Sequence, residues 1–286
     1  MSANRTIYAK YHEKMARLIH GCSMGTFSFV PDSVFDEYAD YFTKTVSKEE
    51  MFKLYRYSSV ERWDDNKKEK VFNIDLQKIF LVTNGKQNDV FEGLPQSDFD
   101  IHSVEECVGR ISDLVHLKSF TETNDNMLMW AHYADSYKGV CIEYDMKRAD
   151  DIIKKTLFPV VYTKDRRIYA SVDELISFLD EENSEQSLED YKGIFLSKAS
   201  YWKYENEWRI LILNNGKSNH VIELPLRCVS SIYMGPRISK KHQECIVKMV
   251  ENYNKFNTQH KIKLYTAMLD ENKYSIKFNQ HDCWEE

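Results

Sequence analysis

The chain has 286 residues, a formal net charge of −6 and 42% hydrophobic residues, values typical of a soluble globular protein. The mild acidity argues against a large nucleic-acid-binding surface, and nine glycines and five prolines are too few for a collagen-like or glycine-rich disordered chain. No G-x-G-x-x-G or G-x-x-x-x-G-K-[ST] motif is present, so neither a Rossmann dehydrogenase nor a P-loop nucleotide hydrolase is expected.

The sequence also bears on compartment and metal binding. No stretch of 18 consecutive apolar residues occurs, and residues 1–20 lack the apolar core and cleavage site of a secretory signal. The six cysteines are scattered without a C-x-x-C pair. We therefore expect a cytoplasmic protein with free thiols, no membrane contact and no metal site.

Two helices are predicted in the first 50 residues. Apolar residues recur at helical spacing over residues 4–20, where Gly21 can end the helix, and Pro31-Asp32-Ser33 opens a second helix. We predict that residues 1–50 form a helical N-terminal appendage that contacts a partner, and that residues 51–286 form an α+β core domain.

Beyond residue 50, strands outnumber helices. Alternating or continuous apolar patterns predict strands at 51–59, 79–82, 117–122, 140–144, 160–162, 207–213, 220–224, 229–234, 261–267 and 274–278, and helical patterns lie at 103–115, 127–134, 172–200 and 240–256. Residues 61–70 form a polar stretch, for which no strand or helix is predicted. Because helices and strands do not alternate regularly, we expect an α+β fold with a mostly antiparallel, split sheet and flanking helices.

Polar residues stand beside the first of these strands. Arg56 is predicted on the same strand face as Leu54, toward the core, where a guanidinium needs a carboxylate or a phosphate as its partner. An ion pair at the strand end is the alternative to a ligand site. The segment from Asn88 to Glu92 follows a turn signal and either holds its own loop or faces a ligand.

A second group follows the strand at 117–122. Ser119 and Thr121 are predicted on one face of that strand, and two inward-facing hydroxyls indicate a hydrogen-bonded partner. Trp130, His132 and Tyr133 come shortly afterwards on a short helix that Thr123-Asn124-Asp125 can cap. The alternative is a helix that simply buries its apolar face, with His132 in a structural role.

A third group opens the strand at 207–213. Glu205 and Glu207 are two residues apart, so in an extended conformation both point to one face. Such carboxylates stay close either because cations such as Arg209, Lys198 or Arg56 lie between them, or because one serves as an ionised stabiliser in a site. An ordinary salt-bridged strand edge is the alternative.

Several of these segments resemble one bacterial family. The runs LYRYSS, NDVFE, SFTETNDNMLMWAHYADSYKGVCIEYD and FLSKASYWKYENEWRIL, followed by SSIYMGPRIS, resemble the family called domain of unknown function 2971, over about residues 52–245. The most specific parts are Met-Trp-x-x-Tyr-x-x-x-x-x-Gly at 129–139 and Trp-x-x-Glu-x-Glu-x-Arg at 202–209. Val90 replaces the family's usual proline, and residues 1–50 lie outside the resemblance. The family name implies no activity.

A second resemblance implies a chemistry. The order Arg56, Ser119-x-Thr121 and Glu205-x-Glu207 is similar to that of Arg–Ser–Glu type ADP-ribosyltransferases, which hold NAD in a cleft without a glycine-rich loop. The resemblance implies that Glu207 holds the ribose 2′-hydroxyl and stabilises an oxocarbenium-like cation, and that Glu205 lies near the nucleophile. It further implies NAD-binding roles for five residues: Arg56 on phosphate, Ser119 and Thr121 in ordering the cleft, and Trp130 or Tyr133 in stacking on nicotinamide.

Three hypotheses follow. The first is an NAD-consuming ADP-ribosyltransferase that acts as a bacterial toxin or defence effector, with a protein or nucleic acid as acceptor. The second is a non-catalytic module that binds protein or nucleic acid. The third is a metal-dependent hydrolase or nuclease that uses Asp89, Glu205 and Glu207.

Overall fold

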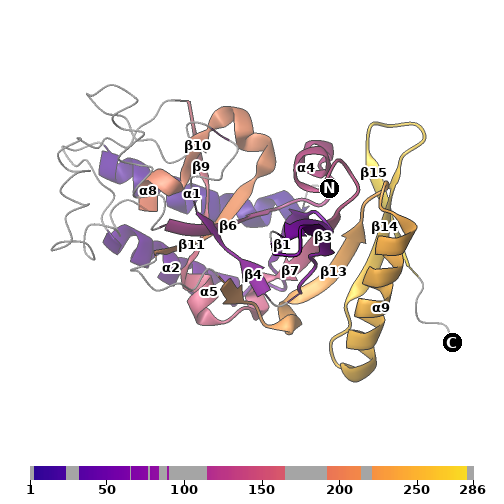
Figure 1. Ribbon diagram of the computed structural model, residues 1–286. Coiled ribbons are helices and arrows are strands. Elements are labelled where there is room, and N and C mark those ends of the chain that lie inside the picture. Colours follow the sequence, from indigo (N-terminus) through magenta and orange to yellow (C-terminus); the bar gives the residue numbers. More distant parts are fainter. Residues whose placement is uncertain are drawn as a thin grey trace. The chain divides into compact units, whose positions relative to one another are not determined.

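The computed structural model describes residues 3–23, 32–64, 66–76, 78–83, 89, 115–164, 192–213 and 221–281 (Figure 1). The helix predicted at 103–115 and most of the one predicted at 172–200 lie outside these residues, as does the loop from Asn88 to Glu92 apart from Asp89. The chain divides into two compact units. The first comprises Met1–Lys48, Ile79–Ser119 and Asp151–Ile222, and the second comprises Glu49–Lys78, Phe120–Asp150 and Glu223–Glu286.

The first unit combines two long helices with short strands. Its elements are α1 (Ala3–Ser23), α2 (Asp32–Val46), β4 (Lys78–Phe80), β5 (Val82–Thr83), α5 (Asp151–Lys155), β8 (Leu157–Pro159), β9 (Val161–Thr163), α8 (Lys192–Phe195), β10 (Ser197–Ala199), the 3-10 helix η4 (Ser200–Glu205), β11 (Glu207–Leu213) and β12 (Val221–Glu223). Strand β6 (Val115–Thr121) contributes its residues 115–119 here and the last two to the second unit. In the sheet β11 lies between β6 and β8, and β5 pairs with β6.

Both N-terminal helices pack on strand β11. The ring of Trp208, which is 0% exposed, meets Tyr11 of α1 at 5.9 Å and Phe42 of α2 at 5.6 Å between centroids. Burial of large aromatic rings is a strong source of packing energy, so the apolar stripes of both helices face the core of the first unit. This confirms the two predicted helices, whereas the domain boundary at residue 50 stays a prediction.

The second unit is built on an open, mostly antiparallel sheet. Its elements are β1 (Lys53–Ser58), β2 (Glu61–Asp64), β3 (Glu69–Phe72), α4 (Met127–Tyr133), β7 (Val140–Asp145), the 3-10 helices η2 (Met146–Arg148) and η5 (Leu226–Cys228), β13 (Val229–Met234), α9 (Lys240–Phe256), β14 (Lys263–Leu269) and β15 (Ile276–Gln280). The strand order is β15-β14-β13-β7-β1 followed by the end of β6, and β13 and β14 are parallel. The predicted α+β class with a mostly antiparallel sheet is confirmed.

One hairpin was missed and one helix cap was predicted wrongly. In the polar stretch at 61–70, β2 and β3 pair as an antiparallel hairpin from Glu61–Phe72 to Asp64–Glu69. Their side chains are largely exposed on both faces, so no apolar alternation marks the strands. Helix α4 is capped by Asn126, whose side chain accepts hydrogen bonds from the N–H groups of Leu128 and Met129, and not by residues 123–125.

The turn between α4 and β7 depends on close backbone contact. Asp135, Ser136 and Tyr137 all have positive φ, a left-handed run that costs energy for L-residues. A Cβ at Gly139 would lie 2.2 Å from the carbonyl oxygen of Ser58, so only glycine fits there. The 129–139 motif therefore encodes a tight turn in which the backbone at Gly139 packs closely against Ser58.

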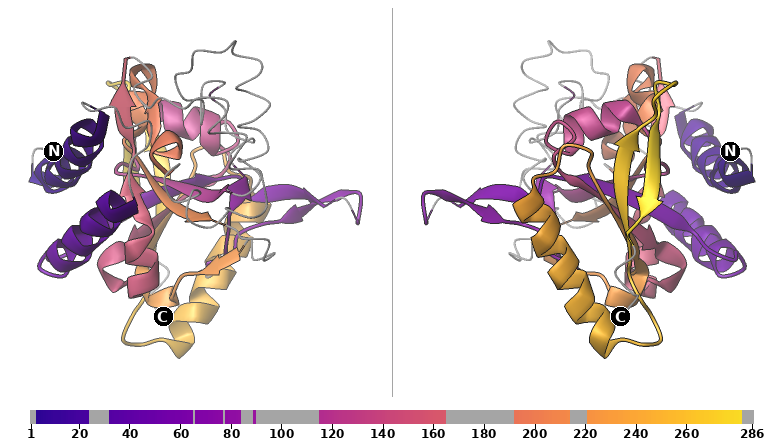
Figure 2. Two further views of the ribbon diagram at one scale, coloured as in Figure 1. Left: turned by 90° about the vertical axis from the view of Figure 1, so that its left-hand side faces the viewer. Right: turned by 90° about the vertical axis from the view of Figure 1, so that its right-hand side faces the viewer.

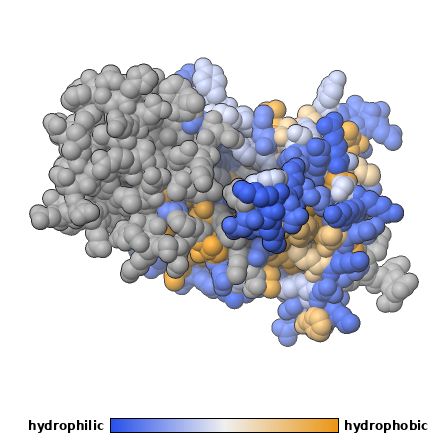
Figure 3. Space-filling model, viewed as in Figure 1, coloured by the Kyte–Doolittle hydropathy of each residue, from blue (hydrophilic) through white to orange (hydrophobic). Residues whose placement is uncertain are grey.

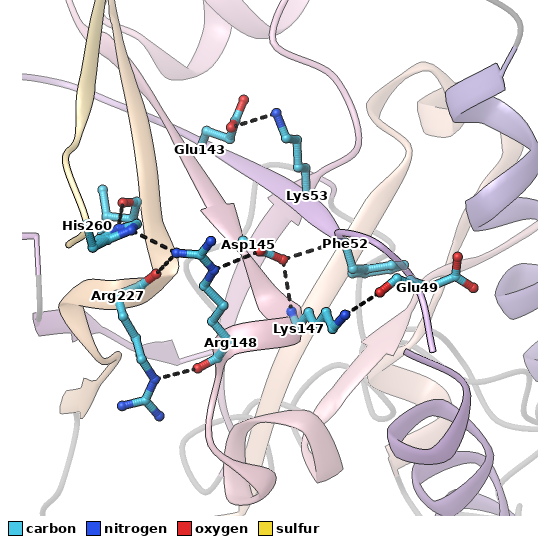
Figure 4. A network of polar contacts seen from close by, with 10 residues as sticks. Glu49, Phe52, Lys53, Glu143, Asp145, Lys147, Arg148, Arg227 and His260 are labelled. Carbon is cyan, nitrogen blue, oxygen red and sulfur yellow. Dashed lines mark hydrogen bonds and ion pairs between the residues drawn. The ribbon is translucent and has the colours of Figure 1, made fainter. Parts of the chain in front are cut away.

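Charged side chains fasten β1 to β7 in the second unit (Figure 4). The buried carboxylate of Asp145 accepts the N–H of Phe52 at 3.1 Å and contacts the Nε of Arg148, also at 3.1 Å. Arg148 in turn lies 2.8 Å from Nδ1 of His260. Since one carboxylate serves both a backbone amide and a guanidinium, it joins the start of β1 to the end of β7.

Candidate functional site

Two carboxylates and two cations meet inside the first unit. The Nζ of Lys198 donates to Oε2 of Glu205 at 2.6 Å and to Oε2 of Glu207 at 3.0 Å. Arg209 binds Glu207 bidentately, from Nε at 2.8 Å and from Nη2 at 2.9 Å. All four residues are buried. We call Lys198, Glu205, Glu207 and Arg209 the carboxylate cluster.

The backbone brings the two carboxylates together in a different way from the one expected. Glu205 ends the 3-10 helix η4, and Asn206 then adopts φ 44° and ψ 55° before β11 begins at Glu207. Asparagine tolerates this left-handed conformation better than most residues. The expectation that both glutamates share the face of one extended strand was therefore wrong, and it is Lys198 of β10 that joins them.

Neighbouring strands fix the rest of the cluster. The backbone N–H of Glu207 donates to the hydroxyl of Tyr162 on β9 at 2.8 Å, and Nη1 of Arg209 donates to the carbonyl oxygen of Phe195 at 2.5 Å. The pairing of β9 with β10 sets Tyr162 beside Lys198. No sequence pattern singled out Tyr162, since its place depends on pairing between distant segments.

Electrostatics keep Glu207 ionised. Burial by itself raises the pKa of this carboxyl, but the charges of Arg209 and Lys198, with hydrogen bonds from Arg209 and from the Ser119 side chain, lower it to about 2. Burial and the nearby Glu207 charge raise the pKa of Tyr162 well above its ordinary value. At neutral pH the site thus combines a buried carboxylate anion with a neutral phenol.

This pKa predicts how stability depends on pH. The folded-state pKa of Glu207, about 2, lies below the ordinary value of 4.5. The group's stabilising contribution is therefore complete above about pH 4.5 and is lost as the pH falls toward 2. We expect the free energy of unfolding, measured with urea at pH 6, 4 and 3, to decrease over this window. In Glu207→Gln the decrease should be smaller, and an equal decrease in both proteins would contradict the assignment.

The structure brings Ser119 to Glu207, as their hydrogen bond shows. It does not bring Arg56 and Thr121 to one face of the sheet. Tyr55 is paired with Thr121 in register, so Thr121 shares the face of Tyr55 and Arg56 points to the opposite face. The predicted common cleft for Arg56 and Thr121 thus conflicts with the register of β1 against β6.

The partner of Arg56 also differs from expectation. Its half-buried guanidinium donates from Nε to the hydroxyl of Tyr144 at 3.3 Å. No carboxylate pairs with Arg56 among the residues that the structure describes. The role of Arg56 in binding phosphate stays a prediction, as does the cleft-ordering role of Thr121.

The aromatic residues of α4 divide into core and surface. Trp130 is fully buried, its indole N–H donates to the carbonyl oxygen of Asn124 at 2.7 Å, and its ring meets the edge of Tyr57. These contacts are those of a core residue and leave no free face for stacking on nicotinamide. Tyr133 is half-buried, and its ring lies 6.3 Å from that of the exposed His132.

Other predicted features concern metals, membranes and thiols. Within the described part of the chain, no group of three or more His, Cys, Asp or Glu residues is placed to hold a metal ion. None of the described helices is both long and apolar enough to cross a bilayer. Cys141 and Cys228 are buried free thiols, and Cys245 is an exposed one.

The comparisons with known proteins bear on part of the chain. A family model described as a protein of unknown function, DUF2971, matches residues 129–210. This match supports the resemblance drawn from the sequence across both specific motifs, from helix α4 to strand β11. Neither the curated proteins nor the solved structures gave a match. The resemblance to ADP-ribosyltransferases is not supported by any of these findings, and the DUF2971 description assigns no activity.

Proposed function

We propose that this protein is an NAD-consuming, ADP-ribosyltransferase-like enzyme in which Glu207 stabilises the transition state. The observation that carries the proposal is the hydrogen bond from Ser119 to a Glu207 carboxylate held ionised by Arg209 and Lys198. A carboxylate with a depressed pKa remains an anion at neutral pH, as stabilisation of a developing cation requires.

The chemistry balances without a metal ion or a redox partner. The bond between nicotinamide nitrogen and ribose C1′ breaks, and its electron pair leaves with nicotinamide. An acceptor oxygen or nitrogen then forms a bond to C1′, and its proton passes to Glu205 or to water. Glu207 would accept a hydrogen bond from the ribose 2′-hydroxyl and offset the positive charge on the ring, with Glu205 near the acceptor. The acceptor would be a protein, a nucleic acid or water, and a toxin or defence role would follow from depletion of NAD or modification of that acceptor.

Binding of the NAD ribose at Glu207 requires a free acceptor position on its carboxylate. The carboxylate of Glu207 already receives hydrogen bonds from Arg209, Lys198 and Ser119. A ribose hydroxyl must therefore replace one donor. Lys198 is the suitable one, because its Nζ keeps Glu205 as an ion-pair partner at 2.6 Å when it leaves Glu207.

Release of nicotinamide tests the proposal. Wild-type protein with NAD and cell lysate should release nicotinamide, and Ser119→Ala should lower the rate about tenfold, because a hydrogen bond to an ionised group is lost. Ser197→Ala is the matched control, since that hydroxyl donates to the carbonyl oxygen of Gly193. Wild-type protein that releases no nicotinamide and transfers no label from NAD would refute the proposal.

One observation favours a second candidate, the non-catalytic binding module. The charges of the carboxylate cluster pair with one another in a buried position, and such a network can serve the fold alone. In that case Ser119→Ala lowers the melting temperature while the protein, wild type and variant alike, leaves NAD intact.

A further inference from the structure

The β2–β3 hairpin of the second unit exposes large aromatic side chains. Trp63 is 56% exposed and Phe72 is 41% exposed. Figure 2 shows this hairpin extending away from the sheet of its own unit. Two exposed aromatics on one short hairpin are not required by its fold, because neither fills a core.

The strand register places these aromatics on one face with a lysine. Trp63 lies directly opposite Lys70, and Phe72 lies opposite Glu61. Since side chains alternate along a strand, all four residues share one face, which we call the Trp63 face. The acidic pair Asp64 and Glu69 is on the other face.

Further cations lie at the turn of the hairpin and at the start of α9. Lys67 and Lys68 are exposed in the turn of the hairpin, next to Lys70. At the other end, Glu61 contacts Nε2 of His242 at 3.0 Å, which sets the first turn of α9 against the base of the hairpin. The start of α9 adds two exposed basic residues, Lys240 and Lys241. Figure 3, viewed toward the hairpin, shows hydrophilic surface over β2 and β3.

We propose that the Trp63 face binds single-stranded nucleic acid. Exposed aromatic rings offer stacking surfaces that every base can use, and lysines beside them contact the phosphates. A protein partner fits less well, because lysine and glutamate are depleted at the centres of protein interfaces. Here Lys70 and Glu61 are the immediate neighbours of the two aromatics. The hairpin segment 61–72 carries four acidic and four basic residues, so its cations are gathered at the turn rather than in excess over the whole segment.

The proposal predicts distinct effects for the aromatic and the cationic residues. By fluorescence anisotropy with labelled oligothymidylate at low salt, Trp63→Ala should weaken binding about tenfold or more, and Trp63→Phe should restore most of it. Lys67→Ala combined with Lys70→Ala should reduce the slope of log K against log salt by about 1.4, at about 0.7 for each lost phosphate contact. Tyr274→Ala is the matched control, because this tyrosine is 98% exposed at another turn of the same unit.

The following controls and results decide whether the Trp63 face binds single-stranded nucleic acid. All substituted side chains are exposed, so thermal melting should show that each variant folds. Failure of the wild-type protein to bind the oligonucleotide would overturn the proposal. So would equal losses in Trp63→Ala and Tyr274→Ala, or tighter binding of a duplex of the same length. This inference is independent of NAD consumption, because the assay contains no NAD and the Trp63 face shares no residue with the carboxylate cluster.

Discussion

Replacement of Arg209 by methionine is expected to lower the free energy of unfolding by about 3–5 kcal/mol, because it removes one partner of a buried ion pair. Arg209 is 0% exposed and supplies two of the hydrogen bonds to Glu207. Methionine keeps much of the apolar volume, so the loss reports mainly the carboxylate left with Lys198 and Ser119. The midpoint of urea unfolding measures this change.

A double variant provides the control. Arg209→Met combined with Glu207→Leu removes the pair as a whole, and an apolar replacement of a buried pair is often close to neutral. Lys198 keeps Glu205 as its partner in that protein. We therefore expect the double variant to be more stable than Arg209→Met alone. A single variant that unfolds at the wild-type urea concentration would show that the pair contributes little to stability.

Patterns of burial explain which elements could be predicted from the sequence. Helix α9 buries one face, so its apolar residues recur with a period of about 3.6. Strand β1 buries Leu54 on one face and Tyr55 and Tyr57 on the other, so its signal is a short run rich in apolar and aromatic residues. The β2–β3 hairpin buries neither face and therefore leaves no such pattern. Trp63 and Phe72 were present in the sequence, but only the pairing of their strands places them on one surface.

The geometry of the candidate site also depends on features that the sequence pattern does not show. Of the three cations expected beside Glu205 and Glu207, the ion pairs include Lys198 and Arg209, whereas the hydrogen bond of Arg56 goes to Tyr144. The conformation of Asn206 that turns the chain between the glutamates could not be read from their spacing. The register of β1 against β6 could not be predicted from the sequence either. This register places Arg56 and Thr121 on opposite faces. Local periodicity fixes which face a residue shares with its own strand, whereas contacts across strands depend on the whole fold.

Replacement of Glu207 by glutamine is expected to lower nicotinamide release at least about 10²-fold, because the anion that offsets the ribosyl cation is lost. The amide also loses its ion pairs with Arg209 and Lys198, so the variant should be less stable as well. The rate must therefore be measured at a temperature at which circular dichroism shows the variant folded.

Arg209→Met then separates catalysis from stability. Like Glu207→Gln, this variant loses the buried ion pair between Glu207 and Arg209. It keeps the Glu207 carboxylate, however, with Lys198 still 3.0 Å away as a counter-charge. If Glu207 stabilises the transition state, Arg209→Met should release nicotinamide at least about tenfold faster than Glu207→Gln under conditions where both are folded. If the two rates fall in proportion to the two losses of stability, the cluster is a structural ion network and the catalytic carboxylate lies elsewhere.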